Sequence, residues 1–166
     1  MQRITFKALA AAAIMAACTA CSSIDCPLNN RVYAKFLIGG DESIRLDTLT
    51  VSTTRAIAEG NDTVLVNRLT GADSLSVPMS YSHSRDAYYF TIVRHETAEV
   101  STDTVWVDKT DTPHFESVDC SPSVFHDITG VSCTRHNIDS ITINNNKVTY
   151  NDAKAHFRIY FKARGN

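Results

Sequence analysis

From residue 31 onward, apolar and polar side chains alternate along the chain with a period of two. The first alternating run covers residues 32–38, and two glycines and an aspartate at 39–41 end it as a turn. Alternation of this kind is typical of a β-strand with one buried face, and no later window shows a sustained helical period. Turn residues separate the further apolar runs, which cover residues 44–51, 64–66, 75–79, 88–93, 105–107, 114–118, 124–133, 141–143, 148–150 and 157–161.

These eight to eleven short strands predict an all-β fold. We expect a single antiparallel β-sandwich with an immunoglobulin-like or transthyretin-like Greek key, and a closed barrel is the alternative. Pro78 lacks an N–H group, so the strand over residues 75–79 is expected at a sheet edge. Residues 141–150 are expected to form the last hairpin, with the asparagines at 144–146 as its turn.

The first twenty residues have a different pattern, which is typical of an export signal. Arg3 and Lys7 precede ten apolar residues at 8–17, and small residues then lead to Cys18 and Cys21. The apolar run is too short to cross a bilayer as a helix. The layout resembles a bacterial lipoprotein signal, in which the cysteine at the cleavage site is lipidated and becomes the new N-terminus. We expect the lipid on Cys21, which two serines follow; Cys18 is the alternative, and cleavage without a lipid is a third possibility.

These boundaries predict a signal peptide at residues 1–20, a lipidated tether at 21–30 and one β-sandwich domain at 31–166. Removal of the signal from the 166 residues leaves 146, which is enough for one domain with its own core. The signal holds two basic residues and no acidic one, so the rest of the chain has 14 basic and 18 acidic residues and a net charge of −4. This balance argues against nucleic acid as a partner, because phosphate binding needs a basic surface.

The cysteines of the exported domain predict a disulfide, because thiols pair in an oxidising compartment. With Cys21 lipidated, Cys26, Cys120 and Cys133 remain, which is an odd number. A Cys26–Cys120 bridge would tie the N-terminal segment to the second half of the chain, whereas a Cys120–Cys133 bridge would close a local loop. We favour the first, because Cys133 lies in an alternating run that accommodates a buried free thiol. The cysteine spacings match no zinc site.

A pattern of acid, hydroxyl and apolar residue occurs five times, with its hydroxyl at Thr48, Thr63, Ser74, Thr104 and Ser140. Aspartate favours turns, and a hydroxyl followed by an apolar residue favours the start of a strand. The pattern also resembles the acceptor motif for protein O-glycosylation in the Bacteroidota, which acts on exported proteins. Of the two interpretations we favour the structural one, because turn-to-strand junctions alone explain the pattern.

Four aromatic residues stand opposite the inferred core positions of their strands, namely Tyr33, Tyr89, Trp106 and Tyr160. On an outer face, such side chains stack on sugars or are buried in partner interfaces. The alternative is that the strand phase differs and that the four residues belong to the core. We favour this alternative, because neither phase nor topology is settled by periodicity alone.

The six histidines form no recognisable catalytic or metal-binding motif. The sequence has no G-x-S-x-G turn, no H-E-x-x-H helix and no D-x-D-x-D-G calcium loop. His114 with Glu116, and His126 with Asp127, are expected on the polar faces of strands. The sequence therefore predicts no enzyme activity, no metal and no cofactor.

Several short segments are shared with a known family. They are Cys26 after the tether, the Asp-Thr-Val-Leu-Val-Asn run at 62–67, segments 75–79 and 103–105, Ser117-x-x-Cys120, and Thr134 with 138–141. Through them the chain resembles small, uncharacterised lipoproteins of the Bacteroidota, a domain of unknown function of the DUF6452 type. Members often have a glycine after the second cysteine, where this chain has Ser121 and Pro122. The resemblance implies an envelope location and an all-β domain, and it implies no functional residues.

The sequence therefore predicts a lipoprotein of the cell envelope, anchored in the outer membrane on its periplasmic or its surface face. Its expected role is a non-catalytic binding or scaffold module for an envelope protein assembly. The first alternative is a glycan-binding surface module, and the second is a small hydrolase. A scaffold needs an apolar patch or an open sheet edge, a glycan binder needs aromatic residues that converge on one groove, and an enzyme needs titratable side chains in a pocket.

Overall fold

The computed structural model describes residue 26 and residues 31–40, 47–54, 62–150 and 152–163. These residues form strands and no helix, so the described part of the chain holds no helix that could cross a membrane. The strands are β1 (Tyr33–Gly40), β2 (Thr48–Thr54), β3 (Asp62–Leu69), β4 (Ser74–Pro78), β5 (Arg85–Val93), β6 (Val100–His114), β7 (Ser123–Cys133), β8 (Ile138–Ile143), β9 (Lys147–Val148) and β10 (Phe157–Phe161).

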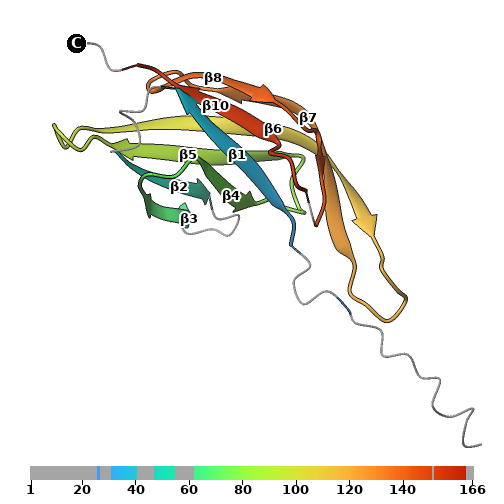
Figure 1. The fold of residues 1–166 in the computed structure, drawn as a ribbon. Coiled ribbons are helices and arrows are strands. Elements are labelled where there is room, and N and C mark those ends of the chain that lie inside the picture. Colours follow the sequence, from blue (N-terminus) through green and yellow to red (C-terminus); the bar gives the residue numbers. More distant parts are fainter. Residues whose placement is uncertain (1–25, 27–30, 41–46, 55–61, 151, 164–166) are drawn as a thin grey trace, which may run out of the picture.

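The strands form two sheets that pack face to face (Figure 1). One sheet has the order β4-β1-β10-β8, and the other has the order β3-β2-β5-β6-β7-β9. The predicted all-β sandwich is confirmed, with one departure: β1 and β10 run parallel, with Phe36 opposite Phe157. Strand β4, which carries Pro78, lies at a sheet edge as predicted.

The core consists of the inward side chains of both sheets. Phe36 of β1 stacks on Phe157 of β10 with ring centroids 4.6 Å apart, and it meets Phe90 of β5 in the other sheet at 5.6 Å. Strand alternation brings every second side chain to this face, and removal of their apolar surface from water stabilises the fold. Other members of the fully buried core are Val51, Val77, Tyr88, Val105, Val107, Ile138 and Ile159.

Strands β6 and β7 continue beyond the sandwich as a long hairpin (Figure 1). Pairing between β5 and β6 stops where Arg85 lies opposite Asp108, and residues 109–114 of β6 pair with β7 alone. At about 3.3 Å per residue, six residues project the hairpin about 20 Å past β5. Residues 115–122 connect the two strands and are called the hairpin tip below.

A disulfide joins Cys26 to Cys120 of the hairpin tip, with Cα atoms 5.5 Å apart. The predicted pairing is therefore confirmed, and Cys133 is the free thiol among the described cysteines. Burial raises the pKa of Cys133, so its thiol stays protonated and unreactive at neutral pH. The expected lipid site at Cys21, and its alternative Cys18, lie outside the described residues.

Two local predictions were wrong. Residues 141–150 do not form a hairpin, because β8 pairs with β10 in one sheet and β9 pairs with β7 in the other. The asparagines at 144–146 therefore connect the two sheets. The separate strands expected at 105–107 and 114–118 are replaced by the single strand β6 and the hairpin tip.

The carboxylate of Asp103 in β6 holds the segment that leads into β8. This buried group accepts the Thr134 hydroxyl at 2.7 Å. It also accepts three backbone N–H groups at 2.6–3.0 Å, from His136, Asn137 and Ile138. Burial opposes the charge, but the four hydrogen bonds outweigh it and lower the pKa of Asp103. Because β6 and β8 belong to different sheets, these bonds link the two sheets.

We predict that Cys26→Ser lowers the free energy of unfolding by about 2–4 kcal/mol, because loss of a long-range disulfide frees the unfolded chain. The bridge spans 94 positions, so its constraint on the unfolded chain is large. Urea unfolding without reductant measures the change. Cys133→Ser is the matched control, since this thiol is unpaired; an equal loss in both variants would contradict the stabilising role of the bridge.

We predict that Asp103→Asn lowers the free energy of unfolding at pH 7 by about 2–3 kcal/mol, because hydrogen bonds to a buried charge are lost. The folded pKa of Asp103 lies below its unfolded value, so the stabilisation is present above about pH 4 and is lost as the pH falls through the folded pKa. Unfolding midpoints measured from pH 7 to pH 2 should therefore fall more steeply for the wild type than for the variant. Asp139→Asn, at an exposed carboxylate of β8, is the control and should follow the wild type.

Candidate functional site

A groove of about 450 Å³ lies at the end of the sandwich from which the hairpin projects. Its walls are the β4–β5 loop and the ends of β2 and β3, which contribute Thr54 and Thr63. Arg31 and Arg85 also line it. The volume is in the range of small-ligand sites, and the lining combines hydroxyl and charged side chains with a larger apolar surface.

Asp86 and Tyr88 form the buried floor of this groove. The Tyr88 hydroxyl donates to the carbonyl of Pro78 at 3.1 Å and lies 3.3 Å from Oδ2 of Asp86, which also accepts the N–H of Ser80 at 3.1 Å. Burial raises the pKa of Asp86, although Lys109 and the hydrogen bonds oppose this. Burial, followed by the charge of Asp86, holds the pKa of Tyr88 well above its ordinary value. Tyr88 is therefore a permanent donor.

Lys109 of β6 lies directly behind the groove, with a side chain that is 0% exposed. Its Nζ donates to the carbonyls of Ser80 and His83 at 2.5 and 2.6 Å, and to the carboxylate of Asp111 at 2.8 Å. The backbone N–H of Lys109 donates to the carbonyl of Ser84 at 2.8 Å. Each ammonium proton thus has an acceptor, and together these bonds fix the β4–β5 loop that forms the groove wall.

His126 of β7 extends this charged network. Its Nδ1 lies 2.7 Å from Asp111, and burial lowers the pKa of His126 although the hydrogen bond to Asp111 raises it. The ring is therefore neutral at pH 7 and donates its Nδ1–H to the carboxylate. A lowered histidine pKa means that stability falls as the pH drops below about 6.5. The expected position of His126 on a polar face beside Asp127 was wrong: it is buried and pairs with Asp111.

Tyr81, whose ring is exposed, lies at the mouth of the groove. The imidazole of His83 contacts two serine hydroxyls there. Nδ1 of His83 lies 3.1 Å from Oγ of Ser80 and 3.0 Å from Oγ of Ser82. A catalytic triad needs a third group to orient the imidazole, and no described carboxylate contacts the other nitrogen of His83. Within the described ranges, no three His, Cys, Asp or Glu side chains gather as metal ligands.

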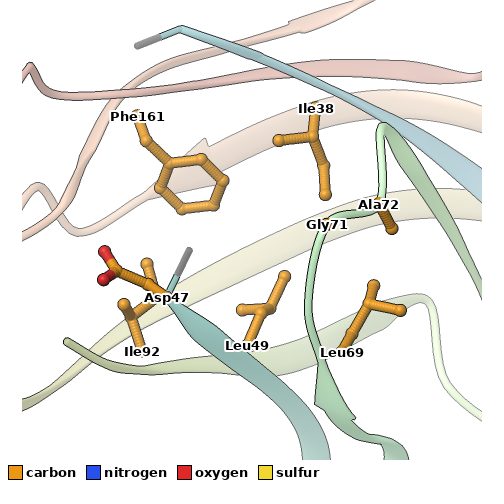
Figure 2. A pocket seen from close by; sticks show the side chains of 8 residues that line it. All are labelled: Ile38, Asp47, Leu49, Leu69, Gly71, Ala72, Ile92 and Phe161. Carbon is orange, nitrogen blue, oxygen red and sulfur yellow. The ribbon is translucent and has the colours of Figure 1, made fainter. Parts of the chain in front are cut away.

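A second hollow lies at the opposite end of the sandwich (Figure 2). Ile38 and Phe161 of one sheet face Leu49 and Ile92 of the other, and the β3–β4 loop closes the side. Asp47 stands at the rim as the one charged lining residue. The volume of about 20 Å³ holds roughly one water molecule, so this hollow is a packing gap and no ligand site.

The four aromatic residues singled out in the sequence lie on the outer faces of the sheets. Tyr33 and Tyr160 are exposed on the four-stranded sheet, where the Tyr160 ring covers Gly39. Tyr89 and Trp106 are half-buried on the outer face of the six-stranded sheet. The expectation that these residues belong to the core was therefore wrong. The two pairs occupy different sheets, so they do not converge on one groove.

The five candidate glycosylation hydroxyls fall into two groups. Thr48, Thr63 and Ser74 stand at the first or second position of their strands, which confirms the turn-to-strand explanation for them. Thr104 and Ser140 lie inside β6 and β8, where that explanation was wrong. Glycosylation itself stays a prediction, and Thr63 is the one exposed residue of the five, the others being half-buried.

Asp86 and Lys109 are site residues that no sequence motif singled out. The signal that could have found them is the strand phase: Asp86 shares its face with Tyr88, and Lys109 shares its face with Val107. A charged residue at an inward position predicts a buried charge that needs a partner. The partners come from the β4–β5 loop and from Asp111, and only the fold brings these together.

We predict that Lys109→Met lowers the free energy of unfolding by about 3–5 kcal/mol, because it leaves buried acceptors without their cation. The matched control is Lys147→Met: that side chain is 72% exposed, and its ammonium lies 3.7 Å from Asp127. An exposed pair of this kind contributes about 0–1 kcal/mol. Urea unfolding compares the two variants. A similar small loss in both would show that the buried network does not stabilise the loop.

A comparison with known protein families gives one match. The model of a family of unknown function, DUF6452, matches residues 48–161, which is more than half of the chain. The match includes the groove walls, the buried Lys109 network and the whole hairpin. No curated protein and no solved structure matches the chain. The chain therefore belongs to the DUF6452 family, a family of unknown function.

Proposed function

We propose that this chain is a lipid-anchored binding module of the bacterial cell envelope, which docks onto an envelope protein through an open sheet edge and has no catalytic activity. The open edge of β3 is the observation that carries the docking role. The export-type signal at residues 1–20 and the disulfide support the location, because disulfides persist in oxidising compartments. The outer membrane of a member of the Bacteroidota is the proposed setting.

The proposed anchor is a lipid on Cys21. Two serines after Cys21 start a polar tether that leads to Cys26, where the disulfide connects the tether to the folded domain. A single acyl chain holds a protein on a membrane only marginally, whereas several chains hold it stably. The several chains of a bacterial lipoprotein would therefore keep the domain at the membrane surface.

The proposed docking element is strand β3. It is eight residues long, it pairs with β2, and no described strand pairs with its other edge. Val64 on this strand is 53% exposed. An open edge offers N–H and C=O groups to a partner strand, and strand addition is a common mode of recognition. The edge strand expected from Pro78, β4, is five residues long and ends at a residue without an N–H, so it is the weaker candidate.

The contacts of the buried charged network support a role without catalysis. Lys109 and His126 each bond to Asp111, Lys109 also bonds to the loop backbone, and the ammonium and the imidazole are buried. An enzyme needs its titratable groups to reach the substrate. These groups instead hold the wall of the groove in place.

A glycan-binding role is the second candidate, and the groove favours it. Its hydroxyl and charged side chains can bond to sugar hydroxyls, and the exposed ring of Tyr81 offers an aromatic face that stacks on a sugar ring. A glycan array probed with the wild type and with Tyr81→Ala tests this candidate. A glycan bound by the wild type and lost in the variant would replace protein docking as the main function.

We predict that Cys21→Ser moves the protein from the membrane fraction to the soluble fraction, because the variant lacks the lipidated thiol. Fractionation of cells and immunoblotting measure the shift. Cys18→Ser is the matched control and should stay at the membrane. Retention of Cys21→Ser together with release of Cys18→Ser would move the lipid to Cys18, and retention of both would refute the anchor.

We predict that a photo-crosslinking residue at position 64 captures one recurring envelope protein in intact cells. The same residue at Val100, which is 62% exposed at the far end of β6, is the control. Mass spectrometry identifies the captured proteins. Docking through β3 requires capture at 64 and not at 100; equal capture of abundant neighbours at both positions would contradict it.

A further inference from the structure

The hairpin tip displays two apolar side chains to solvent. Phe115 is 64% exposed and Val118 is 98% exposed. Both lie outside the sandwich core. Residues 109–114 of β6, which pair with β7 alone, place them about 20 Å beyond the start of β5. Exposed apolar side chains at the far end of a projecting hairpin contribute nothing to the core, so they need another explanation.

The base of the tip is rigid, so these two side chains are presented at a defined place. The ring of His114 stacks on Phe125 at 4.2 Å, and Phe125 meets the ring of Tyr150 edge-on at 5.0 Å. The Tyr150 and Ser123 hydroxyls are hydrogen-bonded to each other. Within the tip, the N–H of Cys120 donates to the carbonyl of Ser117 at 3.2 Å, which forms a turn around Val118.

The disulfide places this tip close to the proposed lipid. Cys26 lies five positions after Cys21, and five positions of fully extended chain span about 18 Å. A lipid on Cys18 would allow about 29 Å. The polar headgroup layer on each side of a bilayer is about 5–8 Å thick. Because Cys26 is bonded to Cys120, the tip is the described part of the domain that the tether holds nearest to the membrane.

We propose that the hairpin tip is a membrane contact, in which Phe115 and Val118 enter the interface of the bilayer that holds the lipid. This inference rests on the proposed lipid anchor. Aromatic and aliphatic side chains partition into the boundary between headgroups and acyl chains. The tip also carries Glu116 and Asp119, so it favours a zwitterionic surface over an anionic one. With this contact, the hairpin separates the sandwich from the bilayer as a spacer.

The test uses the mature, lipidated full chain in phosphatidylcholine vesicles with brominated acyl chains, which quench tryptophan emission at close range. Trp106 is the one tryptophan of the chain, so Trp106→Phe gives a silent background. Val118→Trp reports on the tip. Val100→Trp, at the end of β6 that lies away from the tip, is the matched control. We expect quenching of at least about twofold for Val118→Trp, because interfacial side chains reach the acyl boundary, and little quenching for Val100→Trp.

The outcomes separate this inference from the anchor. If the protein does not sediment with the vesicles, the lipid anchor fails and the tip contact fails with it. If the protein sediments and Val118→Trp is unquenched, the anchor stands and the tip contact is overturned. Equal quenching of both reporters would indicate general adsorption and would also overturn it. If the tryptophan of Val118→Trp is buried from water in native membranes but is unquenched in the vesicles, the tip contacts a protein partner instead.

A second variant tests the role of the disulfide in placing the tip. In Cys26→Ser the lipid is no longer tied to the hairpin tip, and Val32, the first buried residue of the domain, lies eleven positions or about 40 Å of extended chain after Cys21. Quenching of Val118→Trp should then fall by about half or more, while sedimentation with vesicles is unchanged. Undiminished quenching would show that the bridge does not direct the tip to the bilayer.

Discussion

The buried ammonium group of Lys109 joins three parts of the molecule. It lies in β6 where pairing with β5 has ended, and the register with β7 shifts between Asp108 and Lys109. Its bonds hold the β4–β5 loop, which is a wall of the groove, and its partner Asp111 stands at the base of the hairpin. A buried charge is tolerated only where its protons are all accepted, so these three parts depend on one another. The sandwich, the groove and the hairpin therefore meet at one polar junction.

One end of the sandwich gathers nearly all the features with functional potential. The start of β1, the β4–β5 loop and the base of the hairpin lie together there, since Tyr33 pairs with Pro78 and Arg85 pairs with Asp108. The disulfide brings the N-terminal segment to the same side through Cys26. In the proposed arrangement, with a lipid on the tether, this end would face the bilayer and the groove would lie between the membrane and the sandwich. The opposite end has only the small packing gap (Figure 2).

Two carboxylates, the buried Asp103 and the half-buried Asp152, connect distant segments of the fold. Asp103 ties the segment before β8 to β6, and Asp152 accepts hydrogen bonds from Thr149 and His156. His156 in turn accepts the N–H of Lys35 in β1. Burial acts against both carboxylates, yet their hydrogen bonds lower the pKa of each. Such groups stabilise the fold at neutral pH and stop doing so in acid, whereas a chain of purely apolar contacts would not sense the pH.

The sequence by itself determined the all-β class, because period-two alternation is a local property of each strand. It also determined the edge position of β4 through Pro78, and it favoured the Cys26–Cys120 bridge. Only the tertiary structure decided that β8 and β9 belong to different sheets, since register depends on partners far along the chain. For the same reason the partners of Lys109 could not be read from its neighbours in sequence. The groove and the projecting hairpin follow from where pairing stops, and that is a property of the whole fold.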